Sequence, residues 1–151
     1  MNNSIKILMI AFMAITFVSA NTCKAQSDVL TSYIELKDAL VQSNPALAKT
    51  SARSLGQKLA GANMSNDLVA AANSIASTDD LKAQRTAFKS VTDQLIESFK
   101  NGDLDDSVYV QHCPMAFNNT GASWLSTSEE IFNPYFGNMM LKCGFVKETI
   151  E

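Results

Sequence analysis

Four stretches between Ser27 and Gly102 carry apolar residues at the three- and four-residue spacing of amphipathic helices. The apolar positions are Val29, Tyr33, Leu36 and Leu40; Leu47, Leu55 and Leu59; Leu68, Ala72 and Ile75; and Leu81, Phe88, Val91, Leu95 and Phe99. Short polar connections separate the four stretches. The pattern therefore predicts an antiparallel bundle of about four helices whose apolar stripes form the core.

Capping residues mark where these helices begin. Asn44 followed by Pro45 predicts the start of the second helix, because Asn accepts hydrogen bonds at the N-cap and Pro fits the first helical position. Ser65 opens the third helix, which is expected to end near Ala76. A hydroxyl and two carboxylates in residues 77–80 predict the start of the fourth, since carboxylates in a first turn meet the positive end of the helix dipole.

The pattern of residue types changes after Gly102. Val108, Tyr109 and Val110 favour a strand, and proline or glycine then recurs at positions 114, 121, 134, 137 and 144. The expected fold is mainly α, an antiparallel helical bundle followed by a loop-rich C-terminal segment with one or two short strands. We expect a single domain over residues 26–151, with the bundle at 26–102 and the segment at 103–151.

The first 25 residues predict a secretory signal peptide. Lys6 precedes an apolar run of roughly a dozen residues, which is shorter than the ~20 residues that span a bilayer. Cleavage is expected after Ala20 or after Ala25. Anchoring as a lipoprotein through Cys23 is the less favoured alternative, because the Leu usual three places before such a cysteine is absent. The mature chain is expected in the periplasm, without a transmembrane segment.

Charge and motifs exclude several functions. The net charge is −3 and no cluster of Lys or Arg is present, which argues against a nucleic-acid-binding face. GxSxG, HExxH, P-loop and GxGxxG motifs are absent. A Cys113–His112 nucleophile is disfavoured because adjacent residues seldom place a thiol within reach of an imidazole, and the chain has one His. We therefore do not expect an enzyme.

Side chains with metal-binding chemistry gather in the C-terminal segment. His112, Cys113 and Met115 lie within four positions, and Met140 precedes Cys143 by three. Thiolate and thioether ligands select Cu(I) over hard cations, while Cys with His also suits Zn(II). The residues favour a soft metal, with copper ahead of zinc because Met is prominent.

A disulfide is the competing interpretation of the same cysteines. Cys113 and Cys143 are roughly 30 residues apart, and in an oxidising compartment a bond between them would stabilise the fold by ~3–4 kcal/mol. The methionines would then fill gaps in the core, and His112 would be a surface or hydrogen-bonded residue. Trp124 and the turn formed by Asn133, Pro134, Tyr135 and Gly137 are expected to be structural under either interpretation.

The C-terminal segment resembles the DUF3347 family. The resemblance is carried by YVQHCPMAF, GASWLS, EEIFNPYFG and MMLKCGFV between Tyr109 and Val146. Members of that family look like small exported proteins, or like an extra domain on periplasmic adaptors of copper- and silver-type efflux systems. The resemblance implies an extracytoplasmic domain associated with metal handling.

Two functions therefore remain open. In the first, a non-enzymatic domain binds Cu(I) through Cys113, Met115, Met140 and Cys143, with His112 as an auxiliary ligand, and sequesters the ion or passes it to an efflux adaptor. In the second, a Cys113–Cys143 disulfide stabilises a module that binds another envelope protein and no metal.

Overall fold

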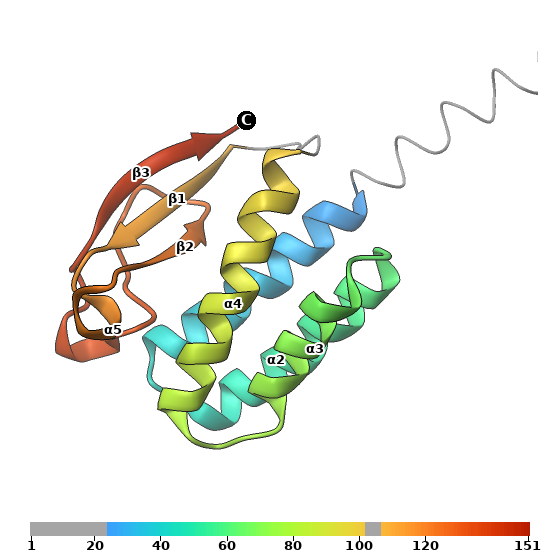
Figure 1. Ribbon diagram of the computed structural model, residues 1–151, viewed down its shortest axis with the longest axis horizontal. Coiled ribbons are helices and arrows are strands. Elements are labelled where there is room, and N and C mark those ends of the chain that lie inside the picture. Colours follow the sequence, from blue (N-terminus) through green and yellow to red (C-terminus); the bar gives the residue numbers. More distant parts are fainter. Residues whose placement is uncertain (1–23, 102–106) are drawn as a thin grey trace, which may run out of the picture.

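The computed structural model describes residues 24–101 and 107–151 (Figure 1). Its first half consists of an N-terminal helix, helical over residues 24–41, and of α2 (Pro45–Gly61), α3 (Asn66–Ala76) and α4 (Leu81–Lys100). Figure 1 shows α4 standing between the sheet on one side and α2 and α3 on the other. The predicted set of four helices is confirmed.

The helices begin where the capping residues indicate. The Asn44 side chain accepts a 3.0 Å hydrogen bond from Leu47 N, and Pro45 takes the first helical position. Ser65 caps α3 in the same way. For α4 the capping residue within the 77–80 stretch is Asp80, whose carboxylate accepts from Lys82 N at 2.9 Å. Each cap satisfies a backbone N–H that lacks a partner within the helix.

The C-terminal half contains more sheet than the sequence predicts. Three antiparallel strands, β1 (Val108–Cys113), β2 (Ala122–Ser126) and β3 (Phe145–Ile150), lie in the order β2-β1-β3. A short turn of left-handed residues, α5 (Ala116–Asn119), joins β1 to β2. A long connection containing the 3₁₀ turn η1 (Gly137–Met139) then leads to β3.

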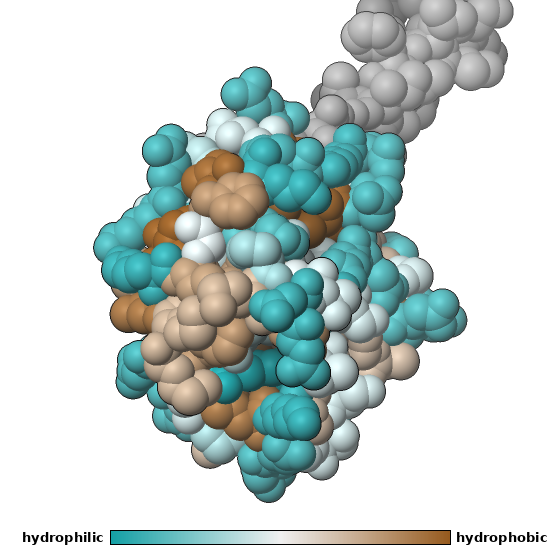
Figure 2. Space-filling model, turned by 60° about the vertical axis from the view of Figure 1, so that its left-hand side comes forward, coloured by the Kyte–Doolittle hydropathy of each residue, from teal (hydrophilic) through white to brown (hydrophobic). Residues whose placement is uncertain are grey.

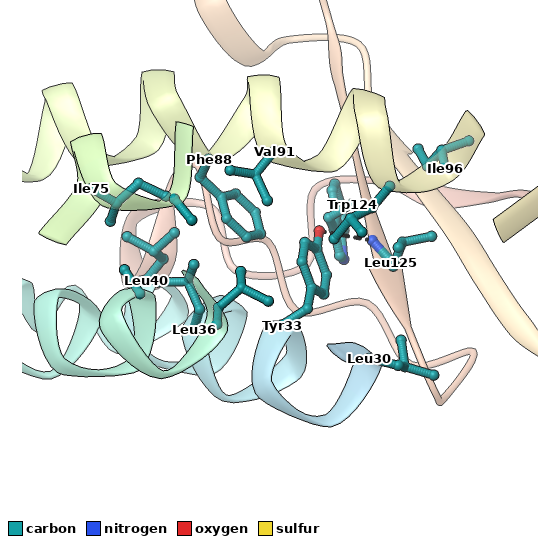
Figure 3. Packing of buried hydrophobic residues seen from close by; sticks show 14 of the residues in the cluster. Leu30, Tyr33, Leu36, Leu40, Ile75, Phe88, Val91, Ile96, Trp124 and Leu125 are labelled. Atoms are coloured by element: carbon teal, nitrogen blue, oxygen red, sulfur yellow. Dashed lines mark hydrogen bonds between the residues drawn. The ribbon is translucent and has the colours of Figure 1, made fainter. Parts of the chain in front are cut away.

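The core continues from the bundle into the sheet. Tyr33 of the N-terminal helix stacks on Phe88 of α4 with ring centroids 5.1 Å apart, and both rings are buried (Figure 3). The Tyr33 hydroxyl accepts a 3.1 Å hydrogen bond from Leu125 N of β2 and lies 2.7 Å from Thr92 Oγ1. The buried hydroxyl therefore has one hydrogen-bond partner on the sheet and one on α4, so neither polar group is left unsatisfied at this contact. The buried residues of the bundle and of the sheet therefore form one hydrophobic core.

Arg85 fastens the C-terminal turn to the end of the bundle. Its Nε donates to Pro134 O at 2.8 Å, and its Nη2 donates to Leu40 O at 3.1 Å and Ser43 Oγ at 3.0 Å. Gly137 packs against the same point with a φ of +56°. Arg85 thus caps the last turn of the N-terminal helix, where a cation meets the negative end of the helix dipole, and also positions the 133–137 turn.

Residues 1–23, which include most of the expected signal peptide and Cys23, lie outside the described residues. In the part of the chain that is described, no helix has the length and apolar character needed to cross a membrane.

Candidate cysteine and methionine site

The two cysteines meet at the end of the sheet. Cys113 is the last residue of β1 and is fully buried, and Cys143 lies in the turn before β3. Their Sγ atoms are 2.7 Å apart and share a hydrogen bond, and both cysteines are free thiols. This separation is shorter than the ~3.5–4 Å van der Waals contact of two carbon atoms and longer than the ~2.05 Å of a disulfide. The fold therefore brings two distant thiols into direct contact.

The backbone around Cys143 is held by Asn133, which is buried. The Asn133 Nδ2 donates to Cys143 O at 2.8 Å, while its Oδ1 accepts from Tyr135 N at 2.8 Å and from Phe136 N at 3.2 Å. Its backbone N–H donates to Leu141 O at 2.8 Å. An Asn followed by Pro initiates such a turn because its side chain can bond the backbone two residues later.

The predicted methionine ligands line one groove next to this pair. Met115 follows Cys113 by two residues and is 48% exposed, and Met140 precedes Cys143 by three and is half-buried. Both border a groove of about 710 Å³ between the start of α4, α5 and η1. Met139, by contrast, is 76% exposed and does not border this groove. The fold thus gathers four sulfur-bearing residues from two separate segments at one end of the sheet.

His112 faces away from Cys113. Successive residues of a strand point to opposite sides of a sheet, and His112 lies opposite Ser123 in β2, with its Nδ1 3.0 Å from Ser123 Oγ. Its ring packs edge-on against Phe145 of β3 at 5.8 Å. Partial burial, followed by the charge of Lys147, lowers the pKa of His112. The structure therefore does not place this auxiliary candidate beside the thiols.

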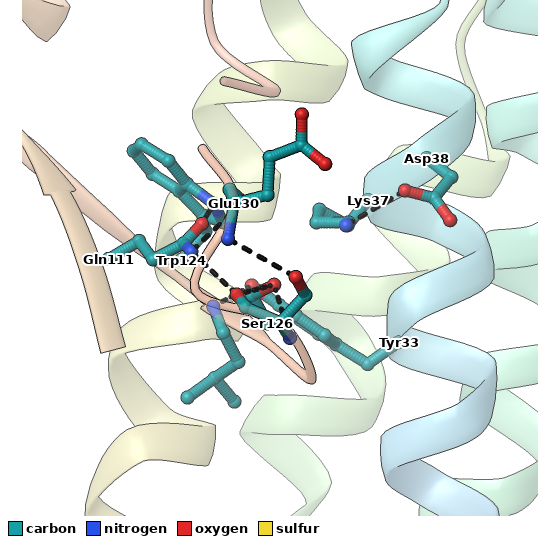
Figure 4. A network of polar contacts seen from close by, with 9 residues as sticks. Tyr33, Lys37, Asp38, Gln111, Trp124, Ser126 and Glu130 are labelled. Atoms are coloured by element: carbon teal, nitrogen blue, oxygen red, sulfur yellow. Dashed lines mark hydrogen bonds and ion pairs between the residues drawn. The ribbon is translucent and has the colours of Figure 1, made fainter. Parts of the chain in front are cut away.

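Trp124 and Gln111 form a buried polar pair behind the site. Trp124 Nε1 donates to Gln111 Oε1 at 2.7 Å, and Gln111 Nε2 donates to the carbonyl oxygens of Ser128 and Glu130 (Figure 4). Both side chains are fully buried. Sequence reasoning missed Gln111, whose only signal is an amide side chain directly after the apolar residues 108–110 of the strand. The pair fixes the loop after β2 against β1.

The chemistry of the thiol pair depends on whether it is protonated. The contact with Cys113 and, secondarily, burial raise the pKa of Cys143 to about 11. Near neutral pH the Cys143 thiol therefore holds its proton. A soft metal binds thiolates, so an incoming ion would have to displace this proton.

The donor set fits a soft ion better than a hard one. Across residues 24–101 and 107–151, no group of three or more His, Cys, Asp or Glu side chains could hold a metal. The available donors are the two thiols in contact and the thioethers of Met115 and Met140, which are close to them in the sequence, and such donors suit Cu(I). Two thiolates at ~2.3 Å from one ion would stand farther apart than 2.7 Å. Binding would therefore require the turn carrying Cys143 to move outward.

These features define a small helical domain with a C-terminal three-stranded sheet and a contacting pair of cysteines. The chain belongs to the family described as "Protein of unknown function (DUF3347)", which matches residues 29–107, about half of the chain. The family assignment is confirmed, but the match lies on the helical half and not on the C-terminal motifs that carried the resemblance. No curated protein and no solved structure matches the chain.

Proposed function

We propose that this protein is an extracytoplasmic domain that binds a soft metal ion, Cu(I), in its reduced state. The observation that carries the proposal is the contact between Cys113 and Cys143, whose Sγ atoms are 2.7 Å apart. Met115 and Met140, which are two and three residues from these cysteines in the sequence, border one groove. Sulfur donors of both kinds select Cu(I), and none of the described residues that line the groove is a carboxylate.

The arrangement of the segments supports uptake and release of the ion. Cys113 is fixed in the central strand, whereas Cys143 lies on a turn, so the turn is the part that would move to admit a metal. Met115 is half-exposed, which gives an ion arriving from a partner protein a first soft ligand at the surface. A site with these properties suits a carrier that sequesters copper or passes it to an efflux adaptor. Zinc is the second metal that the thiol pair suits.

The alternative function, a disulfide-stabilised interaction module, is supported by the distance between the same two thiols. The 2.7 Å contact is already closer to a disulfide than to a metal-bridged pair, and extracytoplasmic thiols tend to be oxidised. In this alternative the Cys113–Cys143 bond ties the terminal turn to β1 and stabilises a module that binds another envelope protein. The contact distance favours this state for protein that has been exposed to oxidant.

A competition titration under anaerobic conditions tests the first function. The reduced protein is titrated with Cu(I) against a chromophoric chelator of known affinity. We expect one tightly bound ion, with binding abolished in Cys113→Ser and in Cys143→Ser. Tight binding that persists in both variants would refute the site, and an absence of binding by the reduced wild type would leave the disulfide module.

Methionine variants supply a matched control. Met140→Leu and Met115→Leu are each expected to weaken Cu(I) affinity about tenfold, equivalent to ~1.4 kcal/mol. Met139→Leu should leave affinity unchanged, because the Met139 side chain is 76% exposed and lies outside the groove. His112→Ala should also leave affinity unchanged, since the imidazole bonds Ser123 on the other face of the sheet.

A further inference from the structure

The groove beside the cysteine pair has features that sulfur chemistry does not explain. It lies between the first turns of α4, the α5 turn and the turn before η1, and its volume of about 710 Å³ is typical of small-molecule sites. Phe117, Tyr135 and Phe136 supply aromatic surface, and the amide side chains of Asn118 and Asn119 border it. Figure 2, which turns the side of the sheet toward the viewer, shows apolar surface on this side of the molecule broken up by hydrophilic side chains.

The charges that border the groove are of one sign. Lys82 and Arg85 both line it, and none of the described lining residues is acidic. Lys82 forms no ion pair with any residue in the described ranges. The side chain of Arg85 bonds only neutral oxygens there, although Arg85 is 9% exposed.

A buried cation is normally compensated by a counter-charge. The C-terminal end of the N-terminal helix offsets part of the Arg85 charge through the Leu40 carbonyl. Lys82 is exposed and forms no ion pair within the described residues, and the nearby Asp80 carboxylate accepts from its backbone N–H. The groove therefore presents a positive potential next to an aromatic surface, which is complementary to an anion that carries an apolar body.

One wall of the groove is held in an unfavourable backbone conformation. Phe117, Asn118 and Asn119 have φ values of +52°, +56° and +65° in succession. This conformation costs Phe117 ~1–2 kcal/mol, whereas Asn adopts it more readily, and such conformations concentrate at ligand clamps. The Phe117 ring is fixed by an edge-on contact with Tyr135 at 5.4 Å. The fold thus holds this turn in a rigid form against the groove.

We infer that this groove binds an organic anion, a carboxylate with an aromatic or aliphatic body. The carboxylate would pair with Lys82 and with Arg85, which also lines the groove, and the body would lie against Phe117, Tyr135 and Phe136. The inference needs no metal and therefore stands or falls separately from copper binding. The bordering thioethers of Met115 and Met140 add apolar, polarisable surface.

The test uses 4-phenylbutyrate as the probe and 4-phenylbutanol as a neutral molecule of the same shape. Binding to the full, metal-free, reduced protein is followed by ¹H–¹⁵N NMR. We expect saturable shifts of the Asn118 and Asn119 amides with the acid, and a dissociation constant about tenfold weaker, or more, with the alcohol. Equal affinities would overturn the inference, because they would show an apolar site with no anion selectivity. No saturable shift with the acid would overturn it as well.

Two variants locate the charge. Lys82→Glu should weaken binding of the acid about tenfold or more while the protein remains folded, since Lys82 is exposed and Glu suits the first turn of a helix. Lys147→Glu makes the same change of net charge on β3, outside the groove, and should leave the dissociation constant unchanged. Equal dissociation constants for the wild type and Lys82→Glu would show that the groove is not the anion site.

Discussion

Asn133 fixes the position of Cys143 by a 2.8 Å hydrogen bond from its Nδ2 to the Cys143 carbonyl. The same side chain accepts from the backbone of Tyr135 and Phe136. One buried amide therefore organises the turn that brings the second thiol to Cys113. The position of Cys143 therefore depends on Asn133, although Asn133 itself carries no sulfur.

Removing that amide should loosen the turn. Asn133→Ala removes the partner of one buried and two partly buried backbone groups, and each unsatisfied buried group costs ~1–3 kcal/mol. Because the turn can relax, we expect a total loss of ~2–4 kcal/mol in the free energy of unfolding, measured by urea denaturation. Asn138→Ala, on the exposed side of η1, is the matched control and should change stability by less than ~0.5 kcal/mol. A loss equal to that of the control would show that the turn holds itself together without Asn133.

The state of the thiols should change stability in a predictable direction. Oxidation that joins Cys113 to Cys143 closes a loop of roughly 30 residues and should raise the free energy of unfolding by ~3–4 kcal/mol relative to the reduced protein. The measurement is urea denaturation of the oxidised and reduced forms, with thiols counted under denaturing conditions. In Cys143→Ser the two conditions should give the same stability. If the free energy of unfolding of the wild type is the same with and without reductant, the Cys113–Cys143 bond does not form.

The helices were predictable because their signals are local. Asn44 and Ser65 sit at the N-caps that their side chains predict, and each capping bond spans three residues. The strand β3 was missed because most of its side chains are exposed, so that the sequence shows no alternation of buried and exposed positions. Its register depends on pairing with β1, more than 30 positions away.

The types of side chain at the site could be predicted from the sequence, but their arrangement in the fold could not. Proximity in sequence suggested His112 as a partner of Cys113, yet strand geometry puts the two side chains on opposite faces. The contact between Cys113 and Cys143 depends on the 133–143 turn, which no short-range pattern specifies. Arg85 looks like an ordinary charged residue on an amphipathic helix, but its acceptor Pro134 O is 49 residues away.

The buried hydroxyl of Tyr33 provides a test of how the bundle holds the sheet. Tyr33→Phe removes the acceptor of the Leu125 N–H and the partner of Thr92 Oγ1 while keeping the ring stacked on Phe88. We expect a loss of ~1–3 kcal/mol in the free energy of unfolding, because polar groups are left buried without partners. Tyr109→Phe, on the half-buried side of β1, removes a hydroxyl of the same kind and should cost less than ~0.5 kcal/mol. Equal losses in the two variants would argue against a special role of the Tyr33 hydroxyl.

The close packing of Gly137 on the bundle yields the last prediction. Gly137 has a φ of +56°, and a Cβ there would lie 2.9 Å from Val41 O and 3.0 Å from Arg85 Nη2. Gly137→Ala should therefore lower the free energy of unfolding by ~2–4 kcal/mol, from the left-handed backbone and from displacement of Arg85. Gly61 is the matched control, because it ends α2 with open space around the added carbon and an ordinary φ. Gly61→Ala should raise stability by ~0.4–1 kcal/mol through the entropy of the unfolded chain. Opposite signs for the two variants in thermal or urea unfolding would show that the turn is pressed against the end of the bundle, and a neutral Gly137→Ala would refute that packing.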